Sequence, residues 1–208
     1  MSVARTERRQ LADLFDEVGP DAPTLCTPWH TRDLAVHLLV RERRPDAVSG
    51  YFVNAFAGYT HLVERRYQRW PWPKLVDTIR NGPPRWSVFG LEAADRAGNA
   101  AEFFVHHEDV RRAQEGWRPR PADPDRDGEL WSVLTRFARV LLRKVPVGVV
   151  LRRPDGAEIT GRRGPDTVTL VGQPGELLLY AYGREAAEVD FEGDQVSIAR
   201  VRAARRGI

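Results

Sequence analysis

Two side chains that can bind a metal ion stand four residues apart in the segment NAAEFFVHHEDVRRA, residues 99–113. On a helix, Glu102 and His106 would lie one turn apart on the same face. A third candidate, His37, lies on the apolar side of the segment TRDLAVHLLVRER, so we expect its ring to point into a helical bundle. One carboxylate and two imidazoles can bind a divalent ion and leave a coordination position open, as catalytic sites do. The alternative is that each histidine is an ordinary hydrogen-bonded residue of the core or surface.

Other reactive side chains stand close to this set in the sequence. Asp109, three residues after His106, has two possible roles: it orients a metal-bound imidazole, or it pairs with Arg111 or Arg112. His107 should point about 100° away from His106 and is assigned a structural role. The sequence places no partner for His30 or His61.

Cys26 is the single cysteine of the chain. One cysteine excludes an internal disulfide and a cysteine-rich zinc site. The sequence leaves two readings open for this thiol, a buried inert group and a nucleophile.

Helices must position these side chains. The spacing of apolar residues predicts helices over residues 3–18, 31–43, 51–69, 91–114 and 129–144. For the second of these helices, Thr31 is the expected N-cap, and the helix should end before Pro45. A short turn is expected at residues 75–79. This series, with mostly short connections, indicates a helical bundle over residues 1–145.

The pattern changes near Pro146. Short β-branched runs separated by turns predict strands, and PGELLLYAYGR predicts a short helix. The segments AEVDFEG and QVSIARV are predicted as two further strands. Residues 146–208 should therefore form a small α+β domain, which makes the fold class α+β.

Composition restricts the classes of protein that remain. The chain has 208 residues, 42% hydrophobic and 29% charged, with no apolar run long enough for a membrane span and no signal-peptide pattern. We therefore expect a cytoplasmic protein without a membrane partner. The net charge of +3 comes from basic residues interleaved with acidic ones, which argues against a nucleic-acid partner. For the arginine-rich end RVRAARRGI we expect a solvated tail, with nucleic-acid binding as the alternative.

Three segments together resemble the mycothiol-dependent maleylpyruvate isomerase family, within the DinB-like metal-binding four-helix bundles of actinobacteria. They are LCTPWHTRDLAVHLLVRERRPDA, NAAEFFVHHEDVRRA and GQPGELLLYAYGR, in the order the family has them. The part RERRPDA and the short C-terminal domain resemble a separate actinobacterial metal-binding branch more than the isomerase itself.

The resemblance implies a function and a set of site residues. It implies a zinc site of His37, Glu102 and His106, a C-terminal domain similar to sterol-carrier folds, and mycothiol as a thiol cosubstrate. A thiol bound to a metal loses its proton at neutral pH and becomes a nucleophile toward a small electrophilic substrate. Arg184, in the Gly-Arg pair of the third segment, would hold an anionic substrate, with a structural ion pair as the alternative.

Two further functions remain open from the sequence. The first alternative to a thiol-dependent isomerase or S-transferase is a non-catalytic metal-binding module whose C-terminal domain holds an apolar ligand. The other is a regulatory protein that binds nucleic acid through its arginine-rich end. The sequence assigns neither the substrate nor the oligomeric state.

Overall fold

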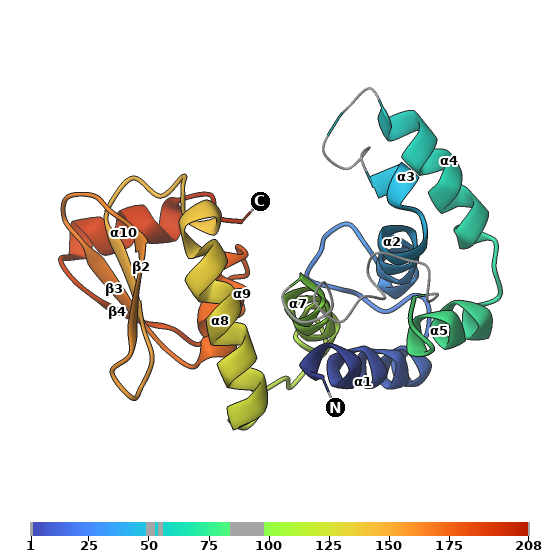
Figure 1. Ribbon diagram of the computed structural model, residues 1–208, viewed down its shortest axis with the longest axis horizontal. Coiled ribbons are helices and arrows are strands. Elements are labelled where there is room, and N and C mark those ends of the chain that lie inside the picture. Colours follow the sequence, from blue (N-terminus) through green and yellow to red (C-terminus); the bar gives the residue numbers. More distant parts are fainter. Residues whose placement is uncertain (1, 49–52, 54–55, 84–97, 208) are drawn as a thin grey trace. The chain divides into compact units, whose positions relative to one another are not determined.

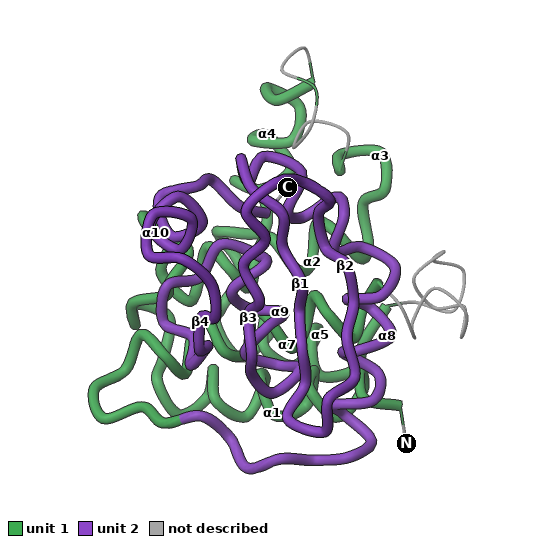
Figure 2. The backbone as a smooth tube through the Cα atoms, turned by 90° about the vertical axis from the view of Figure 1, so that its left-hand side faces the viewer, with its two compact units in different colours: residues 1–118 green, residues 119–208 purple. Residues whose placement is uncertain are grey.

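The computed structural model describes residues 2–48, 53, 56–83 and 98–207 (Figure 1). They form two compact units, residues 1–118 and 119–208, which Figure 2 shows in green and purple. Helices and a four-stranded sheet are both present, as the sequence predicts. Within the described ranges, no helix has the length and apolar character needed to cross a membrane.

The first unit is helical. Its helices are α1 (Val3–Val18), α2 (Thr31–Arg43), α3 (Pro45–Val48), α4 (Ala57–Gln68), α5 (Trp72–Arg80) and α7 (Ala100–Arg111). Helix α1 packs against α5 and α7, and α2 packs against α3, α4 and α5. The predicted start of the helix at 51–69, and residues 91–97 of the helix at 91–114, lie outside the described residues.

Two local predictions in this unit are wrong. Thr31 is not the N-cap of α2 but its first helical residue, and its hydroxyl donates to the Gly19 carbonyl at 2.6 Å. His30 takes the cap position because the Asp33 carboxylate accepts a hydrogen bond from the His30 backbone N–H at 3.0 Å. The short turn predicted at residues 75–79 belongs to the longer helix α5.

The second unit combines helices with a sheet. Its elements are α8 (Pro124–Leu141), β1 (Val149–Arg152), β2 (Glu158–Arg162), β3 (Val168–Val171), α9 (Pro174–Ala181), β4 (Asp190–Glu192) and α10 (Gln195–Ala203). The strand order is β2-β1-β3-β4, with β1 and β3 parallel and the outer pairs antiparallel.

Helix α8 belongs to the second compact unit and not to the first. From the sequence, this helix was expected in the helical bundle, with a domain boundary between residues 145 and 146. Its buried stripe, which includes Leu130, Leu134 and Leu141, instead belongs with α9 and β2, so the compact units divide after Arg118.

The segment QVSIARV is a helix and not the predicted strand. Its alternating apolar residues fit a strand, but Asp194 caps the first turn of α10 by accepting a hydrogen bond from the Ser197 N–H at 3.0 Å. The arginine-rich end that follows is not simply a solvated tail. Arg206 is 8% exposed and donates to the carbonyls of Tyr180 and Val201 at 3.1 and 3.0 Å.

A buried ion pair joins two helices of the first unit and contacts a third. Arg8 of α1 donates to Glu42 of α2 through two hydrogen bonds of 2.8 and 2.5 Å, and both side chains are almost fully buried. The Arg8 guanidinium also lies 4.3 Å from the centre of the Phe103 ring of α7. One arginine thus connects α1, α2 and α7, and the last two carry the candidate metal ligands.

We predict that Glu42→Ala lowers the free energy of unfolding by about 3–5 kcal/mol, because it leaves the Arg8 charge buried without its partner. The double variant Arg8→Met, Glu42→Leu should be less destabilised than Glu42→Ala. Urea denaturation measures both, with Arg80→Ala, which breaks exposed ion pairs, as a control expected to cost no more than about 1 kcal/mol. A change below about 1 kcal/mol for Glu42→Ala would contradict this role.

Candidate metal centre

The three predicted ligands, one on α2 and two on α7, place their ligand atoms within 4.8 Å of one another. The His37 Nε2 atom lies 3.2 Å from Glu102 Oε1, and the His106 Nε2 atom lies 3.3 Å from the same oxygen. The rings of His37 and His106 are 5.4 Å apart at an angle of 72°. One oxygen and two ring nitrogens therefore converge on one point, and they can meet a single divalent ion after small side-chain movements.

The side chains of the three ligands are not fully buried. The side chains of His37, Glu102 and His106 are 16%, 22% and 11% exposed. An ion held here could thus be reached by a small molecule, which a fully enclosed structural site would not allow.

A buried carboxylate holds the His106 ring in place. The Asp109 side chain is 0% exposed, and its Oδ2 atom lies 2.9 Å from His106 Nδ1. If Nδ1 carries the proton and donates to Asp109, the lone pair of Nε2 is directed toward Glu102 and His37. Arg111 and Arg112, the alternative partners of Asp109, both bind Glu108, at 2.9 and 2.6 Å.

The surroundings shift the pKa of two ligands in opposite directions. Burial acts to lower the pKa of His106, but hydrogen bonds with Asp109, Cys26 and Glu102 outweigh it and raise this pKa well above 6.5. Burial acts to raise the pKa of Glu102, but the charge of Arg41 and hydrogen bonds with both histidines hold it well below 4.5. Without a metal, the carboxylate stays ionised and protonated imidazole balances it.

Arg41 belongs to this site although the sequence analysis did not propose it. Its Nε lies 3.3 Å from Glu102 Oε1, and its Nη1 donates to Asn99 Oδ1 at 2.7 Å. Arg41 follows His37 by four residues on α2, so the same spacing argument that joined Glu102 and His106 could have found it.

The loop between α1 and α2 supplies two more neighbours. The Trp29 ring lies 5.2 Å from the His37 ring, and the Cys26 thiol donates to Asp109 Oδ2 at 3.0 Å. The Leu25 N–H binds the Asp109 carbonyl at 3.0 Å and fixes this loop on α7. The Cys26 side chain is only partly buried, so the expected buried thiol lies instead at the edge of the site.

Cys26, His106 and Asp109 form a second group with metal-ligand chemistry. His106 would bind through Nδ1 here, 3.9 Å from the sulfur. An ion at this position would have to displace the hydrogen bond that Asp109 accepts from the ring. We therefore favour the group at Nε2, where the ring nitrogen already faces two other ligands.

The other candidate residues have partners of their own. His107 Nδ1 is 2.9 Å from Glu7 of α1 in a buried pair, in agreement with a structural role. His61 pairs with Glu64 at the surface at 2.9 Å. Arg184 belongs to the second unit, where its Nη1 donates to the Tyr182 carbonyl at 2.9 Å.

Comparison with known proteins gives a likeness at the level of the fold. No protein-family model matches the sequence, and no curated protein is similar to it. A solved structure of the mycothiol-dependent maleylpyruvate isomerase is similar over 91% of this chain and 90% of that chain, with a TM-score of 0.50 and 14% identity. A structure of a point mutant of an enzyme of the same name gives a TM-score of 0.48 and 15% identity over the same shares. The chain therefore has the fold of this isomerase.

We predict that the raised pKa of His106 makes the metal-free protein depend on pH. Because the folded pKa lies above the unfolded value near 6.5, the stabilisation is complete below about pH 6.5 and is lost as pH rises through the folded pKa. Asp109→Asn should lower this pKa, since the ring loses its anionic partner. Titration of the imidazole by NMR measures the pKa, and urea denaturation across the same pH range measures the stability. An unchanged His106 pKa in Asp109→Asn would refute the coupling.

Proposed function

We propose that the protein is a metal-dependent enzyme that uses a low-molecular-weight thiol such as mycothiol either to isomerise a small electrophilic substrate or, as an S-transferase, to join the thiol to that substrate through its sulfur. The observation that carries this proposal is the convergence of the partly exposed side chains of His37, Glu102 and His106 on one point. The fold shared with a mycothiol-dependent isomerase supports the reaction class. We further propose that the chain represents an actinobacterial branch of that fold.

The donor set fits zinc. Two imidazole nitrogens and one carboxylate oxygen form the His2Glu set found in catalytic zinc sites, with room for one further ligand. A bound divalent ion would lower the pKa of a coordinated thiol, so that the thiolate forms at neutral pH. The softer alternative donor, Cys26, lies on the other side of the His106 ring, next to Nδ1.

The protein's own residues have distinct tasks in this proposal. Asp109 holds the proton on Nδ1 of His106 and keeps Nε2 free to bind. Arg41 balances the Glu102 charge when the site holds no cation. Trp29 packs beside His37 and limits water on that side of the ring.

Arg184 is the residue that we propose for substrate binding. Its guanidinium presents a planar set of donors that suits a carboxylate. We propose that it binds the anionic group of the substrate, and Arg184→Lys should then raise KM more than it lowers kcat. A fall in kcat with an unchanged KM would show that Arg184 has another role.

We predict that His106→Ala weakens zinc binding at least about tenfold while the helical unit stays folded. The measurement is a competition titration with a chromophoric chelator, with circular dichroism to report the fold. His61→Ala is the matched control, because it removes an exposed histidine of the same unit. Equal zinc affinity in both variants and the parent protein would refute the ligand assignment.

The catalytic part requires its own test. We expect the zinc-loaded protein to turn over maleylpyruvate or a related electrophile only when mycothiol is present, and removal of zinc by a chelator should abolish the turnover. Tight zinc binding without turnover across a panel of thiols and electrophiles would instead favour the non-catalytic metal-binding module.

A further inference from the structure

A concentration of positive charge in the second unit lies apart from the metal ligands in the sequence. From Leu130 to Pro154 the chain has six basic residues and no acidic one, and residues 159–165 add two more arginines without an acid. Apart from the arginine-rich end RVRAARRGI, basic and acidic residues are interleaved through most of the chain. This separation of charge is therefore local.

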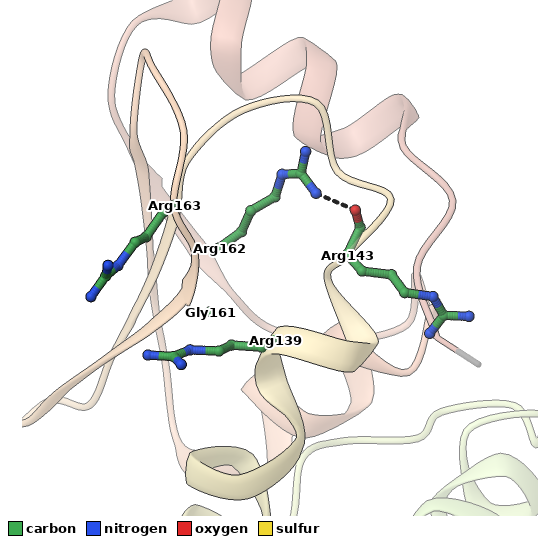
Figure 3. Close-up of a pocket in the computed structure, with 5 residues that line it drawn as sticks. All are labelled: Arg139, Arg143, Gly161, Arg162 and Arg163. Atoms are coloured by element: carbon green, nitrogen blue, oxygen red, sulfur yellow. Dashed lines mark hydrogen bonds between the residues drawn. The ribbon is translucent and has the colours of Figure 1, made fainter.

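The fold gathers part of this charge around a pocket of about 320 Å³. The pocket lies between the C-terminal end of α8 and strand β2, as Figure 3 shows. Its lining residues are Arg139, Arg143, Gly161, Arg162 and Arg163. Its volume is at the lower end of the range for small-molecule sites.

The arginines of this pocket have no carboxylate partner within the part of the chain that the structure describes. Two arginines at the end of the neighbouring strand β1 do have such partners: Arg152 pairs with Glu158 and Glu192, and Arg153, the next residue, pairs with Asp155. Like charges gathered without counter-charges create a strong local potential that attracts anions.

The arginine side chains are not spread evenly around the pocket. Arg139 and Arg163 extend to the same side of the pocket, whereas Arg162 reaches across and donates to the Arg143 carbonyl (Figure 3). The Nε atom of Arg162 is buried and makes no hydrogen bond to any described residue. A buried N–H without an acceptor is costly.

Gly161 allows this geometry. A Cβ atom at this position would lie 2.6 Å from Leu142 Cδ1 and 3.8 Å from Ala138 Cβ. The missing side chain lets β2 approach α8 closely. That approach brings the arginines of the two elements to one pocket.

We propose that this pocket binds a small oxyanion with at least two negative charges, of the phosphate or polycarboxylate class. Arg139 and Arg163 would form charge-assisted hydrogen bonds with its oxygens, and their planar guanidinium groups suit both kinds of anion. A pocket of about 320 Å³ fits a small molecule better than a macromolecule. This site is independent of the proposed metal chemistry.

The test is calorimetric titration of the full-length protein with inorganic pyrophosphate and, separately, with citrate, at about 150 mM salt. We expect saturable binding of one anion per chain. The anion that binds more tightly, pyrophosphate or citrate, identifies the class of ligand. The double variant Arg139→Gln, Arg163→Gln should weaken binding at least about tenfold, because hydrogen bonds to charged groups are lost. Both residues are exposed, so the fold should remain, and circular dichroism verifies it.

The matched control is Arg205→Gln, which removes an exposed arginine of the same unit outside the pocket. This control should bind the anion with less than about a threefold change. Several results would overturn the proposal: no saturable binding of either anion, an equal loss in the control, or unchanged binding in the double variant. Tight binding of a short DNA duplex without binding of the small anions would also overturn it.

Discussion

The candidate site depends on the hydrogen bond between the buried Asp109 carboxylate and His106 Nδ1, 2.9 Å long. This bond determines which ring nitrogen is available, and it turns Nε2 toward Glu102 and His37. Without it the ring could rotate, and the same three residue types would not make a common site. The loop that carries Cys26 adds a second donor to the same carboxylate and so limits its movement.

The helix that carries this bond is buried on most of its surface, including its polar residues. The buried polar side chains of α7 have partners: Glu108 binds two arginines, His107 binds Glu7, and Asp109 binds His106. The Arg8–Glu42 pair performs the same task between α1 and α2. A network of this kind keeps α2 and α7 in register, so the metal ligands need no flexible loop to meet. Such rigidity is what a preorganised metal site requires.

The sequence predicted what short-range spacing can encode. The four-residue interval between Glu102 and His106 and the apolar face around His37 were sufficient to predict that these three side chains lie together. The structure places their ligand atoms within 4.8 Å of one another, and we propose that they form a metal centre. The contact of Cys26 with Asp109 joins residues 83 positions apart, and no local pattern encodes it. The segment QVSIARV fits both a strand and a helix, and the cap at Asp194 and packing against β3 decide for α10. Helix α8 has an apolar stripe that would suit either unit, so only its tertiary contacts assign it to the second.

The most direct test of the account is anomalous scattering at the zinc edge from crystals of the protein prepared with zinc. We expect one strong peak within bonding distance of His37 Nε2, a Glu102 oxygen and His106 Nε2, about 2.0–2.2 Å from each. Arg41 should then have moved away from the carboxylate. A peak beside Cys26 and His106 Nδ1, or no peak while Glu102 remains bound to Arg41, would contradict it.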